Sequence, residues 1–229
     1  MARLVLGLAT SHSPLLSTPP FTRDEPSHGL AIAEHGNCPS SGAVYPGAPD
    51  LADHVIESLT NEDFDVAESS CLPRSVHRPG IPHAYGFVYH RILGDTPPPG
   101  VPVIFNVHYP PNRPLGRRCL ALGRALQRAI QSWNSNSRVA IIASGGLSHF
   151  VIDEALDERV FAAMDSGNED VLARLPENLF RAGTAEIKNW LPVIAAMNGE
   201  GRRFHKVDYV PCYRSEAGTG TAQGFMVWR

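Results

Sequence analysis

The segment from Val139 to Phe150 limits most strongly how this chain can fold. Its first half, Val139–Ala143, is a short apolar run rich in β-branched residues, typical of a strand covered on both faces. Ser144-Gly145-Gly146 ends the run, and glycine lets a backbone approach a ligand closely. His149 is therefore expected just past a core strand, where open α/β sheets hold their chemistry. A turn with a solvent-facing histidine explains the pattern equally well.

Two other expected strands are also followed by histidines. Arg3–Ala9 reads as a buried strand before His12, and Val101–Asn106 as a strand before His108. Pro102 indicates that it lies at an edge or among the first residues of its strand. A histidine at such a position is either a metal ligand or a hydrogen-bonded structural residue, and position alone leaves both open.

The remaining segments predict helices, an edge strand and a final strand. Apolar spacing predicts helices over Asp50–Leu59, Leu115–Trp133, Asp153–Met164, Glu169–Leu175 and Thr184–Leu191. Phe64–Ala67 is expected as an edge strand and Phe225–Trp228 as the last strand, after a turn over Gly218–Gly224. The helix over Leu115–Trp133 should return the chain to Val139 and complete a strand–helix–strand unit.

Glu186 lies near the start of one of these expected helices. Thr184 is a good N-cap, which leaves Glu186 in the first turn, where the helix dipole favours its ionised form. That is the form that binds a divalent metal, although a carboxylate there also simply complements the dipole. Pro192 is expected to kink or end this helix.

Composition indicates one globular domain over 1–229 that is not specialised for nucleic acid or membranes. The 20 basic and 23 acidic residues nearly balance, and no polybasic run or membrane-length apolar stretch occurs. The four cysteines are widely spaced, so neither a disulfide framework nor a zinc ribbon is indicated. We expect a soluble, cytoplasmic protein.

Seven blocks of the sequence carry a family resemblance. They are Gly7–Pro14, Pro82–Tyr89, Tyr109–Asn112, Ser144–Phe150, Asp153–Asp157, Gly183–Trp190 and Asp208–Arg214. In this order they resemble the class III extradiol ring-cleavage dioxygenases, typified by the β subunit of protocatechuate 4,5-dioxygenase, and especially the gallate and 3-O-methylgallate types. The resemblance covers the start of the chain to about Phe21 and the rest from Tyr45.

This resemblance implies an activity and roles for named residues. It implies a non-haem Fe(II) enzyme that opens the ring of a catechol-type substrate of the protocatechuate or gallate class with O₂. His12 and Glu186 would bind the iron, His149 would deprotonate the substrate and orient O₂, and His83 would act as acid. The substrate-binding residues would be Ser148, His108 and Asn112.

The region 22–44 departs from the family pattern. Family members usually carry a longer insertion here, with a second histidine ligand, so the chain has an apparent deletion after residue 21. His28, His35 and His54 are the available substitutes in this part of the sequence. His35 follows the apolar patch Leu30–Ala33 and could end a short strand, whereas His54 is expected to be a partly exposed helix residue.

The predicted architecture is an α/β fold in a single domain. A central mixed or mostly parallel sheet is expected, flanked by helices and resembling the dioxygenase β subunit, with the site at the carboxyl ends of strands. The partners implied are an aromatic diol and O₂, with a homo-oligomer or an α-type subunit possible. Two alternatives remain: an inactive or truncated homologue of this fold, and a zinc hydrolase using His12, His149 and Glu186.

Overall fold

A computed structural model describes residues 3–9, 20–22, 27–28, 44–69, 83–94 and 96–229 of the chain. Within these ranges no helix is long and apolar enough to cross a membrane. The chain divides into two compact units. The first unit consists of residues 1–106 and 129–144, and the second of residues 107–128 and 145–229.

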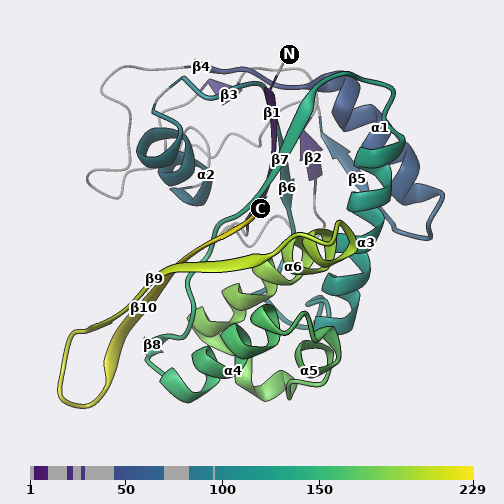
Figure 1. Cartoon of the computed structure of the whole chain (residues 1–229). Coiled ribbons are helices and arrows are strands. Elements are labelled where there is room, and N and C mark those ends of the chain that lie inside the picture. The colour runs from purple at the N-terminus through teal and green to yellow at the C-terminus, as the bar shows by residue number, and fades with distance from the viewer. Residues whose placement is uncertain (1–2, 10–19, 23–26, 29–43, 70–82, 95) are drawn as a thin grey trace. The chain divides into compact units, whose positions relative to one another are not determined.

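The first unit is built on a five-stranded mixed sheet. Its strand order is β5-β2-β6-β1-β7, where the strands are β1 (Arg3–Ala9), β2 (Pro20–Thr22), β5 (Ala67–Ser69), β6 (Gly100–Ile104) and β7 (Arg138–Ala143) (Figure 1). β1 pairs in parallel with both β6 and β7, whereas β2 pairs in parallel with β5 and antiparallel with β6. The prediction of an α/β fold with a mixed sheet is confirmed.

Two strand predictions for this sheet were wrong in detail. β7 is an edge strand, and Arg138 and Ala140 on it are exposed, so Val139–Ala143 is not covered on both faces. An apolar run reports hydrophobicity, but the strand order decides how much of it is buried. Pro102 lies in the middle of β6, between two neighbouring strands, which is tolerated because β2 contributes only one residue pair there.

Helices pack against this sheet through apolar faces. α1 (Pro49–Thr60) buries Leu51, Val55 and Leu59 and contacts β2 and β6. α2 (His83–Phe87) continues into the π-helix η1 (Val88–Ile92), which joins a buried cluster around Tyr85. The Tyr85 hydroxyl donates to the Val103 carbonyl (2.7 Å), which ties α2 to the sheet. A short two-stranded sheet joins β3 (Ser27–His28) to β4 (Val44–Tyr45).

The segment β6–α3–β7 is the predicted strand–helix–strand unit. α3 (Gly116–Ser132) matches the helix expected over Leu115–Trp133 and buries Cys119, Leu126 and Ala129. Both strands are parallel to β1, which lies between them in the sheet.

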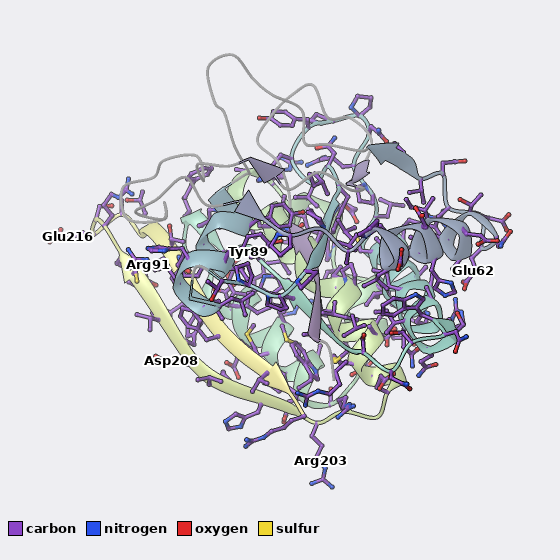
Figure 2. All side chains as sticks on the ribbon, turned by 90° about the horizontal axis from the view of Figure 1, so that it is seen from above. Glu62, Tyr89, Arg91, Arg203, Asp208 and Glu216 are labelled. Carbon is purple, nitrogen blue, oxygen red and sulfur yellow. The ribbon has the colours of Figure 1, made fainter. Side chains whose placement is uncertain are left out.

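The second unit contains a three-stranded antiparallel sheet of order β8-β10-β9. The long strands β9 (Phe204–Tyr213) and β10 (Thr219–Trp228) form a ribbon, and β8 (His149–Val151) pairs with the start of β10. Figure 2 labels Arg203 before β9, Asp208 within it and Glu216 in the turn at the far end of the ribbon. The predicted turn over Gly218–Gly224 was wrong, because six of its residues belong to β10 and pair with β8 or β9.

Helices complete the second unit: α4 (Glu154–Asp165), α5 (Glu169–Ala173), the 3₁₀ helices η2 (Glu177–Leu179) and η3 (Ala182–Asn189), and α6 (Trp190–Gly199). α4 begins as predicted, since the Asp153 side chain accepts a hydrogen bond from the Leu156 amide. It packs against β9 with the Phe161 and Tyr209 rings edge to face, 5.3 Å apart.

The expected helix over Thr184–Leu191 is divided into η3 and α6, so Thr184 is not an N-cap. Pro192 does not end the helix, because α6 continues to Gly199. It lies in the first turn of α6, where backbone amides have no intrahelical acceptor to lose. α3 and α6 are in close contact at Gly123. A Cβ at this position would lie 2.1 Å from the Pro192 carbonyl oxygen, so a side chain there would clash with α6.

Candidate functional site

Glu186, on η3, is the centre of a polar cluster within the second unit. The residue is only 9% exposed, and its Oε2 accepts a hydrogen bond from the Gly146 amide at 2.8 Å. Its Oε1 lies 3.3 Å from His108 Nε2 and 3.8 Å from His149 Nε2. Two imidazoles therefore meet one buried carboxylate.

The surroundings of Glu186 favour its ionised form. Burial by itself would raise the pKa of this carboxyl group. The hydrogen bonds from His108 and the Gly146 amide, together with the charge of either imidazole when protonated, outweigh burial and lower the pKa below its ordinary value. The site therefore holds a carboxylate suited to binding a cation.

The His149 imidazole is held in one tautomer and one place. Its Nδ1 lies 2.8 Å from the Leu147 carbonyl oxygen, which only accepts, so Nδ1 carries a proton and Nε2 is the acceptor nitrogen of the neutral ring. The ring fits against two glycines. A Cβ on Gly146 would lie 2.7 Å from Nδ1, and one on Gly183 would lie 2.1 Å from Cδ2. Both positions have to lack a side chain.

Backbone strain occurs beside both imidazoles. Phe150, the residue after His149, has φ 63°, and Ala182 has φ 50°. The Ala182 carbonyl oxygen lies 3.1 Å from His108 Nδ1. Residues other than glycine with positive φ are uncommon and cluster at functional sites. These two support the assignment of a functional site around Glu186.

A buried network fixes the turn before His149. The Ser148 amide and hydroxyl both donate to the Asp157 carboxylate (2.9 and 2.7 Å), and the Tyr209 hydroxyl donates to it as well (2.9 Å). The Ser148 hydroxyl in turn accepts from the Asp153 amide (2.8 Å). Asp157 is fully buried, and this burial raises its pKa despite the three hydrogen bonds.

The structure brings together three of the residues that the sequence singled out: His149, Glu186 and His108. Ser148, predicted to bind substrate, is fully buried with its hydroxyl in the Asp157 network, and Asn112 is exposed. The roles expected for these residues stay predictions.

Several other candidates lie outside this cluster or outside the described residues. His83 is the first residue of α2 in the first unit, and its side chain is not described. His12 and His35 lie outside the described residues. His54 is half-buried on α1, as expected, and its Nε2 lies within hydrogen-bonding distance of the Ala129 carbonyl (2.9 Å) and the Ser132 hydroxyl (3.0 Å).

Sequence reasoning missed the residues that position the site. Asp157 occurs in a block that resembles the family. Its carboxylate lies next to Leu156 on the apolar face of α4, and this position in the sequence could have indicated a buried polar residue. The Thr184 hydroxyl accepts from the His149 amide (3.3 Å), and Gly183 makes room for the imidazole. No local pattern indicates either contact, because the partners are more than 30 residues apart.

Comparison with known proteins identifies the family. Residues 16–224 match the family described as the catalytic LigB subunit of aromatic ring-opening dioxygenase. The chain belongs to this family. The family resemblance found in the sequence is thereby confirmed, although His12 precedes the matched residues.

A named relative supports the same assignment. The chain is 27% identical over 194 residues to gallate dioxygenase of Pseudomonas putida, an alignment that covers 79% of the chain and 54% of that protein. The chain therefore spans about half the length of this relative.

The donor atoms of the cluster suit a divalent metal. Carboxylate oxygen and imidazole nitrogen are ordinary ligands of iron and zinc, and each imidazole here donates its other ring N–H to a backbone carbonyl, as metal-binding histidines do. Across the described part of the chain, no group of three or more His, Cys, Asp and Glu side chains is arranged as a complete metal site.

Proposed function

We propose that this chain is a non-haem Fe(II)-dependent extradiol dioxygenase that opens the ring of a catechol-type substrate of the gallate or protocatechuate class. The observation that carries the proposal is the buried Glu186 carboxylate with the imidazoles of His108 and His149 beside it. Membership of an aromatic ring-opening dioxygenase family, and the name of the Pseudomonas relative, support the reaction class.

In this proposal Glu186 binds the iron. Its carboxylate is oriented by the Gly146 amide, which occupies Oε2 and leaves Oε1 toward the imidazoles. Fe(II) at this position would hold a catecholate and O₂ next to each other and supply the electronic link between them. His12 stays a proposed second ligand on the strength of the family resemblance alone.

His149 is the proposed general base. Because its Nδ1–H donates to the Leu147 carbonyl, its Nε2 can take a proton from a catechol hydroxyl. The absence of side chains at Gly146 and Gly183 leaves room for the ring in this position, and the Asp157 network holds the Ser148–His149 backbone. His83 is the proposed acid on the basis of the resemblance.

The test is oxygen uptake by the purified chain after anaerobic loading with Fe(II), using gallate, protocatechuate and 3-O-methylgallate. We expect uptake that depends on Fe(II) and ring-opened products that carry both atoms of ¹⁸O₂. Glu186→Ala should abolish oxygen uptake. His149→Ala should lower kcat by about 10²- to 10⁴-fold, which is the usual contribution of a general base to the rate. His205→Ala is the matched control, because His205 is exposed on β9.

The outcomes separate the parts of the proposal. A folded, iron-loaded chain with no uptake on any of the three diols overturns the dioxygenase. Uptake with Zn(II) as well as Fe(II) overturns the iron dependence, because zinc has no redox chemistry. Hydrolytic activity with zinc and no oxygen consumption would favour the hydrolase instead.

A further inference from the structure

The nitrogen atoms of His108 have distinct roles. Nδ1 lies 3.1 Å from the Ala182 carbonyl oxygen, which only accepts, so Nδ1 carries the proton. In the neutral imidazole, Nε2 then presents a lone pair, and this atom lies 3.3 Å from Glu186 Oε1. A lone pair and an ionised carboxylate oxygen repel each other unless a cation lies between them. A proton on Nε2 gives the hydrogen bond to Glu186 described above, and a bound metal ion would take the place of that proton.

We propose that His108 is a ligand, through Nε2, of the divalent metal ion bound by Glu186. The inference rests on the proposed function, because it takes from it that Glu186 binds a metal. It adds a ligand that the family resemblance did not supply, since that resemblance assigned His108 to substrate binding. By the family resemblance, the segment that usually carries the second histidine ligand is shortened in this chain.

The distances distinguish His108 from His149. Two ligands that each lie about 2.0–2.2 Å from one ion, at bond angles between a right angle and the tetrahedral value, are about 2.8–3.6 Å apart. The 3.3 Å between His108 Nε2 and Glu186 Oε1 falls inside this range, and the 3.8 Å from His149 Nε2 falls outside it. His108 is therefore better placed than His149 to share an ion with Glu186, and His149 remains available to move a proton.

Backbone groups hold both ligands in place. The Ala182 carbonyl fixes the His108 tautomer, and the Gly146 amide fixes the Glu186 carboxylate. Ala182 has φ 50°, a strained conformation for alanine that costs on the order of 1 kcal/mol and persists only where the surroundings impose it. Orientation of a metal-binding histidine by a backbone carbonyl is the usual arrangement around metal sites.

The first experiment needs no variant. The wild-type chain, with ¹⁵N-labelled histidine, is loaded anaerobically with one equivalent of Co(II), and paramagnetically shifted ring N–H protons are recorded by NMR. A coordinated His108 keeps its Nδ1 proton on the Ala182 carbonyl, so we expect a strongly shifted, slowly exchanging ¹⁵N-bound resonance. That resonance should be absent in His108→Gln and present in the control His205→Ala.

Metal affinity is the second readout. We expect His108→Gln to weaken Co(II) and Fe(II) binding by about 100-fold in anaerobic calorimetry, and His205→Ala to leave it unchanged. Circular dichroism confirms that each variant is folded. If His108→Gln binds metal as tightly as wild type and keeps every shifted resonance, the His108 ligand is overturned while the proposed metal dependence stands. If the wild-type chain binds no metal stoichiometrically, both proposals fail.

Discussion

Replacing Gly183 with alanine tests whether the position of the His149 imidazole is set by the absence of a neighbouring side chain. A Cβ at position 183 would lie 2.1 Å from His149 Cδ2 and 2.3 Å from Nε2. Carbon atoms in ordinary contact are about 3.5 Å apart, so the ring has to move by more than about 1 Å.

Two magnitudes follow from this displacement. Overpacking of this kind costs about 1–3 kcal/mol of unfolding free energy. Misplacing a catalytic group by about 1 Å lowers the rate by about 10²-fold. We therefore expect Gly183→Ala to lose at least about 10²-fold in kcat for oxygen uptake, with a modest decrease in stability measured by urea denaturation.

Gly116→Ala is the matched control for this substitution. Its Cβ would meet the Leu172 carbonyl oxygen at 3.4 Å and Leu191 Cδ1 at 3.6 Å, which is ordinary contact, so we expect near wild-type stability and rate. A Gly183→Ala variant with wild-type kcat and wild-type stability would refute the reasoning, because it would show that His149 is not confined where the structure has it.

Three further predictions concern buried groups of the second unit. Lys188 is fully buried, and its Nζ donates to the Glu177 carboxylate and to the Pro114 carbonyl. Glu177→Ala should destabilise the chain by about 3 kcal/mol in urea denaturation, and Lys188→Met by less, because only the first leaves a buried cation without a counter-charge. Burial raises the pKa of Cys119 to about 12. Iodoacetamide at pH 8 should therefore label the exposed Cys212 and leave Cys119 unlabelled until the chain unfolds, as measured by mass spectrometry. Equal labelling of the two cysteines in the native state would contradict this. Burial also raises the pKa of Asp157 above its unfolded value near 3.8. The contribution of Asp157 to the free energy of unfolding should therefore decrease as pH rises from about 4 through the folded pKa. Unfolding curves measured across this pH range should show no such decrease for Asp157→Asn.

Local patterns in the sequence predicted much of the fold. The apolar spacing of Leu115–Trp133 identified α3 to within one residue at each end, and short apolar runs identified β1, β6 and β7. These elements were predictable because helices and strands bury one face with a fixed period. The glycine- and threonine-rich start of β10 has no such period, and its pairing with β8 and β9 decides its conformation.

Some features of the candidate site were likewise predictable from the sequence, and others depended on the tertiary structure. By itself the sequence determined the family blocks, the carboxylate at Glu186 and the glycine turn before His149. Only the tertiary structure decided that His108 faces Glu186 across 78 residues of chain, that Asp157 holds the Ser148 turn, and that η3 replaces a helix with Thr184 at its cap. Side chains so far apart in sequence meet only after the elements that carry them have packed, and no local pattern records that packing.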